Sequence, residues 1–401
     1  FGHFFVFTLS LSRFILYQLS TLFFTSKPNQ IACTIFLFGI LQPTQVLSIS
    51  FVCPFLLQLV SYFCTEHKWI VQKLVLIGLM FIYFKKVNLI SLLFFNILRK
   101  LYGLIFLFGF IVQNLINLKL PEITIHYAPR ILFVILFIVF YIQCLKHFKW
   151  KYLLILFVPL LEIYCNPFFQ VYTLNLGQAD CSVIVEPFHK SVVMIDCGQN
   201  LYRDNVERII MPFLENKNIH TIDTLILTHD DFDHNGGYDS LKDKIEIKQV
   251  IEDSNDKVNV DYPFYLLLSE REAKDTNDSS IISYFTYDHL TYLFMGDASK
   301  QVERQLMSEY DLKADVIKVG HHGSNTSSDP DFLDSLDCKI ALISCGYKNK
   351  YGHPSVETLK TLENLHINTL CTSDCGSIAI YSLYHLSFLV TNDGMFGIIW
   401  T

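Results

Sequence analysis

Hydrophobic positions run almost without interruption through the first 165 residues. Long stretches rich in Phe, Leu and Ile are separated by short polar segments such as Lys27-Pro28-Asn29, Glu66-His67-Lys68 and Lys85-Lys86. A transmembrane helix needs about 20 mostly apolar residues, and a soluble buried bundle, the less favoured alternative, would show polar faces with a 3.6-residue period. We therefore expect a multi-span α-helical membrane bundle of about six to eight helices. The candidate spans are 3–25, 31–47, 48–64, 69–84, 87–98, 101–118, 131–148 and 152–165.

Short strand-like segments with turns between them replace these runs from Phe168 onward. Apolar and polar positions alternate with a period of two at 168–177, further segments read as short strands, and a few have helical spacing. Strands outnumber helices, and the helices come singly between them, which predicts two sheets with helices outside, a layered sandwich. The predicted strands are 168–177, 181–187, 190–198, 223–229, 262–269, 281–287, 289–297, 314–322 and 375–390, and the predicted helices are 205–217, 298–310 and 355–365.

Charge divides the chain at the same place. Residues 1–165 carry 13 Lys and Arg against 3 Asp and Glu, a net charge of +10, while residues 166–401 carry 18 against 35, a net charge of −17. Overall, 51% of the residues are hydrophobic and the mean hydropathy is +0.35. We predict two domains, residues 1–165 and 166–401. Because the chain begins with Phe1 inside an apolar run, we expect it to be N-terminally incomplete.

The basic residues between the apolar runs predict an orientation. Loops on the cytoplasmic side of a membrane carry an excess of Lys and Arg. With eight spans, one side holds seven of these charges and the other holds four. The C-terminal half then lies outside the cytoplasm, although one span more or fewer reverses this result. The expectation is a multi-pass protein of the cell membrane, in contact with the lipid bilayer, with an extracytoplasmic C-terminal domain.

Chemically active residues follow directly on four of the predicted strands. Asp196, His229, Asp297 and the pair His321-His322 each come at the end of an apolar segment. Loops at strand ends are where a rigid scaffold presents catalytic and binding groups. Four strands that end in this way are better evidence for one shared site than any single motif.

The densest of these clusters is "THDDFDH" at 228–234. A hydrolytic metal site needs several ligands that converge on an open position for water. His229 and Asp231 are two positions apart, while Asp233 and His234 are adjacent, so a turn can direct one pair at one cation and the other pair at a second. The alternative is a solvated acidic loop. The two histidines and the apolar strand before them argue against this alternative.

These motifs resemble those of a known family. "THDDFDHNGG" at 228–237 resembles the signature of the metallo-β-lactamase superfamily, and "GDAS" at 296–299 resembles its metal-bridging Asp segment. "VIKVGHHGSNTSS", "CGYKNKYGHPS", "NLGQADCSVIV", "VVMIDCG" and "NDSSII" are similar, in the expected order, to the hydrolase domain of the ComEC family of DNA-uptake proteins. The resemblance implies an αββα sandwich over 166–401 and a partial competence-type membrane domain over 1–165. Asn175 and Ala179 depart from the family pattern, which has Asp and Gly there.

The resemblance also implies a ligand set for two divalent metal ions, Zn or Mn. Asp233, His234, Asp297 and one of His321 and His322 would hold one ion, with His322 favoured because it precedes a glycine. His321 would then face the substrate. His229 and Asp231, with Asp297 as a bridge, would hold the second ion.

Further residues receive roles from their motifs. His353 would donate a proton to the leaving oxygen or bind phosphate, the alternative being a structural histidine, and we predict that Asp233, His321 and His353 are catalytic. Ser324 and Asn325 would bind phosphate or, alternatively, cap a turn. Two more carboxylates are expected to brace the metal loops; these are Asp180 and Asp196.

Three hypotheses for function follow. The first is a DNA-uptake channel protein whose phosphodiesterase domain degrades one DNA strand during import, with single-stranded DNA and other DNA-uptake proteins as partners. The second is a transport protein with an idle hydrolase domain. The third is a membrane-tethered hydrolase of small or cell-wall phosphodiesters. The ligand set argues against the second, whereas the charge of −17 over residues 166–401 argues against a long basic DNA groove.

Overall fold

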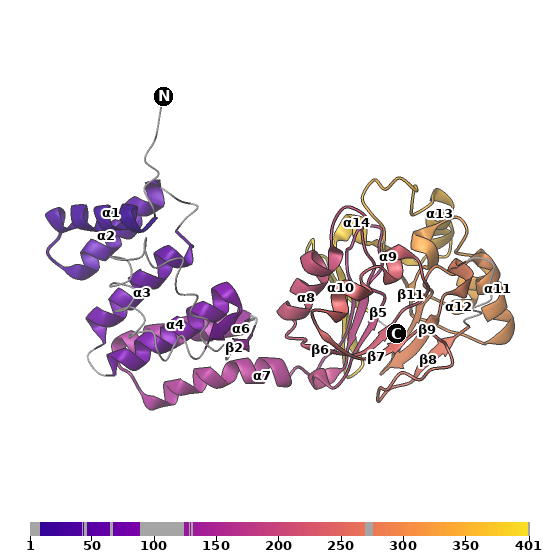
Figure 1. Cartoon of the computed structure of the whole chain (residues 1–401), viewed down its shortest axis with the longest axis horizontal. Helices are drawn as coiled ribbons and strands as arrows, with labels where there is room; N and C mark the ends of the chain where they lie inside the picture. Colours follow the sequence, from indigo (N-terminus) through magenta and orange to yellow (C-terminus); the bar gives the residue numbers. More distant parts are fainter. Residues whose placement is uncertain are drawn as a thin grey trace, which may run out of the picture. The chain divides into compact units, whose positions relative to one another are not determined.

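The computed structural model describes residues 9–41, 43, 46–64, 67–88, 124–127, 129, 131–268 and 276–399. The chain divides into two compact units, Phe1–Glu162 and Ile163–Thr401, whose elements are labelled in Figure 1. The division lies close to the predicted boundary at residue 165.

The first unit is helical. A short antiparallel pair of strands, β1 (Lys86–Asn88) and β2 (Thr124–His126), joins its helices. The described helices are α1 (Leu9–Phe23), α2 (Lys27–Leu41), α3 (Ile49–Phe63), α4 (Lys68–Phe84), α6 (Ile131–Lys146), the 3-10 helix η2 (Trp150–Phe157) and α7 (Val158–Tyr164).

The prediction of a multi-span membrane bundle is wrong for the part of the first unit that the structure describes. No helix there is both long enough and apolar enough to cross a bilayer. The longest, α4, has 17 residues, or about 26 Å at 1.5 Å per residue, against a hydrocarbon core of about 30 Å. The polar segments that separate the apolar runs also end the helices, for example at Lys85 after α4. The candidate span 101–118 and residues 89–98 of its neighbour lie outside the described residues.

The second unit contains two sheets. One has eight strands in the order β16-β15-β14-β3-β4-β5-β6-β7, and the other has six in the order β13-β12-β11-β10-β9-β8. The strands of the first sheet are β3 (Phe169–Thr173), β4 (Ser182–Val185), β5 (Val192–Ile195), β6 (Thr221–Ile226), β7 (Glu246–Ile251), β14 (Ile378–Leu383), β15 (Leu386–Thr391) and β16 (Phe396–Ile399). Those of the second are β8 (Phe264–Leu267), β9 (Ile282–Tyr287), β10 (Leu290–Phe294), β11 (Val316–Lys318), β12 (Ile340–Ile343) and β13 (Asn368–Cys371).

Helices cover the outer faces of both sheets. Figure 1 shows α8 and α10 beside the first sheet and α11 and α12 beside the second. The elements are π-helix η4 (Val206–Ile210), α8 (Met211–Asn216), α9 (Phe232–Asn235) and α10 (Tyr238–Lys242), then α11 (Lys300–Glu309), α12 (Pro330–Leu336), α13 (Val356–Asn364) and α14 (Thr372–Cys375). Three short 3-10 helices are η3 (Pro187–His189), η5 (Asn277–Ser279) and η6 (Gly320–Gly323). This arrangement agrees with the α/β sandwich predicted for this half.

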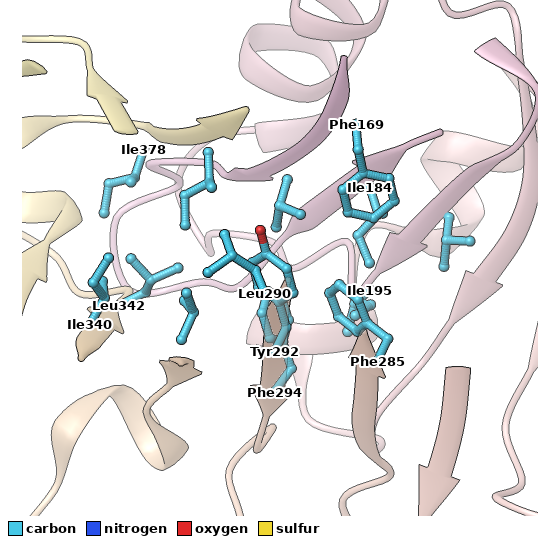
Figure 2. Close-up of a cluster of buried hydrophobic side chains, with 14 of the residues drawn as sticks. Phe169, Ile184, Ile195, Phe285, Leu290, Tyr292, Phe294, Ile340, Leu342 and Ile378 are labelled. Carbon is cyan, nitrogen blue, oxygen red and sulfur yellow. The ribbon is translucent and has the colours of Figure 1, made fainter. Parts of the chain in front are cut away.

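Side-chain alternation along the strands explains why both faces of each sheet are buried. In β4, Ile184 packs between the sheets, while Val183 and Val185 pack on the outer face under the helices. Figure 2 shows the inter-sheet cluster, where Ile184 and Phe169 face side chains of the second sheet such as Phe285. Burying one such side chain contributes roughly 1.5–3 kcal/mol. The two sheets are therefore held rigidly against each other.

Strand direction brings the loops of the site to one edge. β5 and β6 run parallel in the first sheet, and β10, β11 and β12 run parallel in the second. The carboxyl ends of parallel neighbours lie at the same edge, where ligands bind in open α/β sheets. The residues that follow these strands are the ones that the sequence singled out.

Candidate metal centre

The loop after β6 presents the first two histidines. His229 follows the strand by three positions, and Asp231 is the N-cap residue of the short helix α9, which contains Asp233 and His234. The His229 and His234 rings are buried, with their centroids 4.1 Å apart. The strand and the helix thus fix two imidazoles side by side without room for solvent between them and the core.

The turn after β10 places Asp297 against these histidines. Gly296 has a φ of +54°, and a Cβ there would lie 2.9 Å from Ser280, so a glycine is needed for the backbone to pass. The Asp297 backbone N–H donates to Ser280 Oγ at 3.0 Å. Asp297 Oδ1 lies 3.0 Å from His234 Nε2. The close turn therefore aims the carboxylate into the cluster.

His321 and His322 form a strained turn after β11. Their φ angles are +48° and +53°, a left-handed conformation that costs non-glycine residues roughly 1–2 kcal/mol each. The His322 ring is fixed by Ser344, whose backbone carbonyl lies 3.0 Å from Nδ1. His322 Nε2 then faces Asp233 Oδ2 at 3.4 Å and Asp297 Oδ2 at 3.7 Å. Strain of this kind persists where surrounding contacts hold a functional geometry.

Two groups of three donor atoms converge in this way, each within 4.8 Å. One is His229, His234 and Asp297, and the other is Asp233, His234 and His322. Overlapping groups also include Asp180 with Asp297 and His322. Imidazole nitrogens and carboxylate oxygens at these separations are the ligands that zinc and related divalent ions take in hydrolases.

Unpaired polar atoms show that the residues fit a metal ion. His229 Nε2, His234 Nε2, His322 Nε2, Asp297 Oδ1 and Asp180 Oδ1 are all buried and have no hydrogen-bond partner. Each such atom costs about 1–3 kcal/mol when it stays unsatisfied. Because the atoms face one another, divalent cations would satisfy several of them at once.

The charges of the site are strongly coupled. Burial alone would raise the pKa of Asp297, but His234 and His322 outweigh it and hold this pKa well below its ordinary value. Burial alone would lower the pKa of His234, yet Asp297 and Asp196 raise it well above its ordinary value. The pKa of His229 is lowered, first by burial and then by the charge of His234. A metal ion must displace protons here, so its affinity will fall at low pH.

Asp196 holds the loop from behind, in the bracing position expected of it. It accepts hydrogen bonds from Thr228 N–H at 2.8 Å and from Thr228 Oγ1 at 2.8 and 3.0 Å. Its Oδ2 also lies 2.8 Å from His234 Nδ1. A carboxylate on the far nitrogen fixes the ring orientation and makes the facing nitrogen a better ligand.

Asp180 is braced by a residue that the sequence analysis missed. Lys318, at the end of β11, donates to Asp180 Oδ2 at 2.7 Å, and both side chains are buried. The second Asp180 oxygen lies 3.6 Å from His322 Nδ1. The available signal was a single charged residue within the apolar segment "VIKV".

Other predicted site residues lie nearby but outside the convergent groups. Asp231 is half exposed, with Oδ2 3.7 Å from His229 Nε2. His321 Nε2 lies 3.9 Å from Asp297 Oδ2, and its Nδ1 is 3.0 Å from Thr326 Oγ1. Among the residues that the structure describes, no group of three donors includes Asp231 or His321. The assignment of individual ligands therefore stays a prediction.

The predicted phosphate-binding residues and His353 line the same region. Ser324 is buried and its Oγ lies 3.0 Å from Thr326 Oγ1, while Asn325 is exposed. The His353 ring centroid is 5.6 Å from that of His321 and 6.3 Å from that of His322. The pKa of His353 is lowered by burial and by the two neighbouring histidines.

Comparisons with known proteins give several matches to this chain. Residues 174–281 match the Metallo-beta-lactamase superfamily. ComE operon protein 3 of Bacillus subtilis is 30% identical over 251 residues, 52% of this chain and 32% of its own length. Competence protein ComA of Neisseria gonorrhoeae is 30% identical over 185 residues, 42% of this chain and 26% of its own. A solved structure, the metallo-beta-lactamase fold protein YhfI from Bacillus subtilis, covers 53% of this chain and 100% of its own at 10% identity, with a TM-score of 0.39.

The chain therefore spans about a third or less of the length of the curated relatives it matches. The superfamily match over the loop that carries His229 and His234 indicates a metal-dependent hydrolase that takes a divalent metal ion. The comparisons confirm the resemblance: the chain is similar to competence proteins of the ComEC family, and its residues 174–281 match the Metallo-beta-lactamase superfamily.

Proposed function

We propose that the second unit is a phosphodiesterase that uses two divalent ions, Zn or Mn, to cleave single-stranded DNA during competence. The observation that carries this proposal is the convergence of five buried, unpaired donor atoms at one edge of the sandwich. When bound, two such ions supply Lewis acidity toward a phosphate ester and acidify the attacking water. His229, His234, Asp297, His322 and Asp233 are the residues that would hold them.

Asp233 would orient the attacking water. Its side chain is 37% exposed, in contrast to the 4% of Asp297, so it lies where the cluster opens to solvent. Its Oδ2 faces His322 Nε2 at 3.4 Å. Burial raises the pKa of Asp233, but the contact with His322 and the charges of His234 and His322 outweigh it, and the pKa falls below its ordinary value. The group is therefore ionised near neutral pH and can accept a hydrogen bond from water.

His353 would bind the phosphate through a hydrogen bond, and the neighbouring amide selects the tautomer that it needs. Gln178 Oε1 accepts from the Gly346 N–H at 3.3 Å, which turns Gln178 Nε2 toward His353 Nδ1, also at 3.3 Å. With Nδ1 as the acceptor, the ring proton of neutral His353 lies on Nε2. The lowered pKa keeps the ring neutral at physiological pH, so Nε2–H is available to donate a hydrogen bond to a phosphate oxygen.

His321, Ser324 and Asn325 would contact the phosphate. His321 is 25% exposed and lies on the same turn as His322, with Nε2 3.9 Å from Asp297 Oδ2, so it lies beside the proposed metal ligands and is open to solvent. Asn325 is exposed beside it. Side-chain N–H and O–H donors of this kind can bind a single phosphate without a basic groove.

DNA is proposed as the substrate because two relatives carry competence-related names. The charge of −17 over residues 166–401 implies contact with only a few phosphates, because extended binding depends on Lys and Arg. That same charge favours a second candidate, hydrolysis of small or cell-wall phosphodiesters. The first proposal also includes other DNA-uptake proteins as partners of this chain.

A matched pair of variants tests the proposal. Asp297→Asn removes a buried carboxylate that faces both histidine groups, whereas Asp230→Asn removes an exposed one whose Oδ1 accepts only from Asn235 at 3.3 Å. Cleavage of labelled single-stranded DNA and of a generic phosphodiester is measured with Mn or Zn added. We expect Asp297→Asn to abolish both activities, and Asp230→Asn to retain activity within about tenfold, or 1.4 kcal/mol of barrier.

The outcomes separate the candidates. Equal losses in the two variants would overturn the metal-site assignment, because charge loss alone would then explain them. Activity on the generic ester but never on DNA would retain the metal site and replace DNA with a small phosphodiester.

A further inference from the structure

A second cluster of potential ligands lies on two hairpin turns, one from each sheet. Asp288 and His289 form the turn between β9 and β10, and His385 lies in the turn between β14 and β15. One donor atom from each of these three residues lies within 4.8 Å of the other two. The five residues of β10, about 17 Å of strand, separate this turn from the one that carries Asp297.

The Asp288 carboxylate faces an imidazole with each of its oxygens. Oδ2 lies 3.0 Å from His289 Nδ1, and Oδ1 lies 3.4 Å from His385 Nδ1. Ligands that surround one zinc ion at about 2.0–2.2 Å are separated from each other by roughly 3–3.5 Å. The two observed distances therefore have the spacing of ligands around a single ion.

A buried hydroxyl positions the His289 ring for this role. Ser387 Oγ is buried and lies 3.2 Å from His289 Nε2, and it is itself held by Ser382 Oγ at 2.7 Å. Without an ion, His289 Nδ1–H donates to Asp288 Oδ2 at 3.0 Å; with an ion bound, the ring proton would lie on Nε2 and be donated to Ser387, which would leave the Nδ1 lone pair for the ion. A histidine that donates its other N–H to a fixed acceptor is the usual arrangement at metal sites.

We infer that Asp288, His289 and His385 form a divalent-cation site that is separate from the proposed catalytic centre. A zinc-like ion bound at this site clamps the two hairpins together. Two imidazole nitrogens and one carboxylate suit Zn, Co or Ni better than Mg or Ca. Three protein ligands leave at least one coordination position for water.

An ion can reach this site from solvent. The His385 side chain is 83% exposed, and Asp288 lines a surface hollow of about 400 Å³ together with Tyr287 and Tyr384. The competing explanation is a metal-free contact in which the Asp288 carboxylate accepts the backbone N–H of His385 and the Nδ1–H of His289. That contact does not need the His385 ring and binds no zinc, so the zinc affinity of a variant without this ring distinguishes the two explanations.

The test compares two histidines with the same backbone conformation. His385 and His366 are both exposed and both have a φ of +58°, which asparagine tolerates well. Zn²⁺ binding to the full chain is titrated by calorimetry, and bound metal is counted after equilibrium dialysis. We expect His385→Asn to lose one zinc ion per chain, or at least tenfold in affinity for that ion, and His366→Asn to lose none.

His289→Gln provides a second measurement should His385→Asn fold poorly, and it should lose the same ion. Unchanged zinc stoichiometry and affinity in both His385→Asn and His289→Gln would overturn the inference, as would an equal loss in His366→Asn. Phosphodiesterase activity should stay at the wild-type level in His385→Asn, so failure of this site is distinguishable from failure of the proposed function.

Discussion

The buried ion pair between Lys318 and Asp180 supports the metal loops, and breaking it should destabilise the second unit. Lys318→Met keeps the length and apolar stem of the side chain but removes its charge. The Asp180 carboxylate would then be buried with no cation at 2.7 Å, while its Oδ1 already lacks a hydrogen-bond partner. Removing one partner of a buried pair typically costs about 3–5 kcal/mol, because the other charge stays desolvated.

An exposed pair provides the matched control. Lys244 and Glu207 lie 3.0 Å apart, with side chains that are 34% and 63% exposed, against 4% and 7% for Lys318 and Asp180. Exposed pairs contribute about 0–1 kcal/mol. Lys244→Met should therefore change the free energy of unfolding by less than about 1 kcal/mol, although both substitutions remove one lysine charge.

The assay is thermal unfolding of the full chain by circular dichroism, with a chelator present so that metal binding does not contribute. For a unit of this size, 1 kcal/mol corresponds to about 2–4 °C. We expect Lys318→Met to lower the melting temperature by roughly 6–20 °C and Lys244→Met by a few degrees at most. Similar small shifts in both variants would refute the reasoning.

The pH dependence gives an independent check on the same variant. In the wild type, burial raises the pKa of Asp180 but Lys318 outweighs it, so the folded pKa lies below the ordinary value. The stability from this group is therefore present above the unfolded pKa and is lost as pH falls through the folded pKa. The deficit of Lys318→Met should be largest near neutral pH and should shrink toward acid, where Asp180 is protonated in the variant. A deficit that does not change with pH would contradict the assigned cause.

Two further predictions concern stability. Burial raises the pKa of Glu303 from 4.5 to about 7, so the wild type should lose about 3 kcal/mol between pH 4.5 and 7. Glu303→Gln should lack this loss of stability when urea unfolding is compared at pH 5 and pH 8. Parallel pH profiles of the unfolding free energy in the variant and the wild type would contradict the assignment to Glu303. A Cβ on Gly198 would lie 1.8 Å from the Asp233 backbone carbonyl, whereas one on Gly397 would meet nothing within 4 Å. Gly198→Ala should cost about 1–3 kcal/mol or more and Gly397→Ala less than about 1 kcal/mol, and equal melting temperatures would contradict this.

Sequence patterns were informative where burial imposes a strict period. Strands such as β4 are buried on both faces and read as short β-branched runs, so the sandwich and most of its strands were predictable. The residues that end these strands were predictable for the same reason, since Asp196, His229 and Asp297 break an apolar run. In the second unit, the strands β7, β12, β13 and β16 were not predicted; β7 and β16 are only partly buried and their alternation is weak.

Features that depend on tertiary contacts were less accessible. The apolar runs of the first unit predicted membrane spans, but the lengths of the helices depend on where polar turns end them. Nothing local indicates that Asp231 lies outside the convergent groups, because that depends on where α9 places its N-cap. The pairing of Lys318 with Asp180 joins positions far apart in the sequence, and so does the meeting of His385 with Asp288.

Metal dependence of DNA cleavage tests the central claim most directly. The full chain is stripped with a chelator, its residual metal is measured, and cleavage of labelled single-stranded DNA is followed while Mn²⁺ or Zn²⁺ is added back. The account predicts no cleavage by the stripped chain and recovery as metal fills the central cluster, with Asp297→Asn failing both to recover activity and to bind these ions. Undiminished cleavage by the metal-free chain, or full recovery in Asp297→Asn, would contradict it.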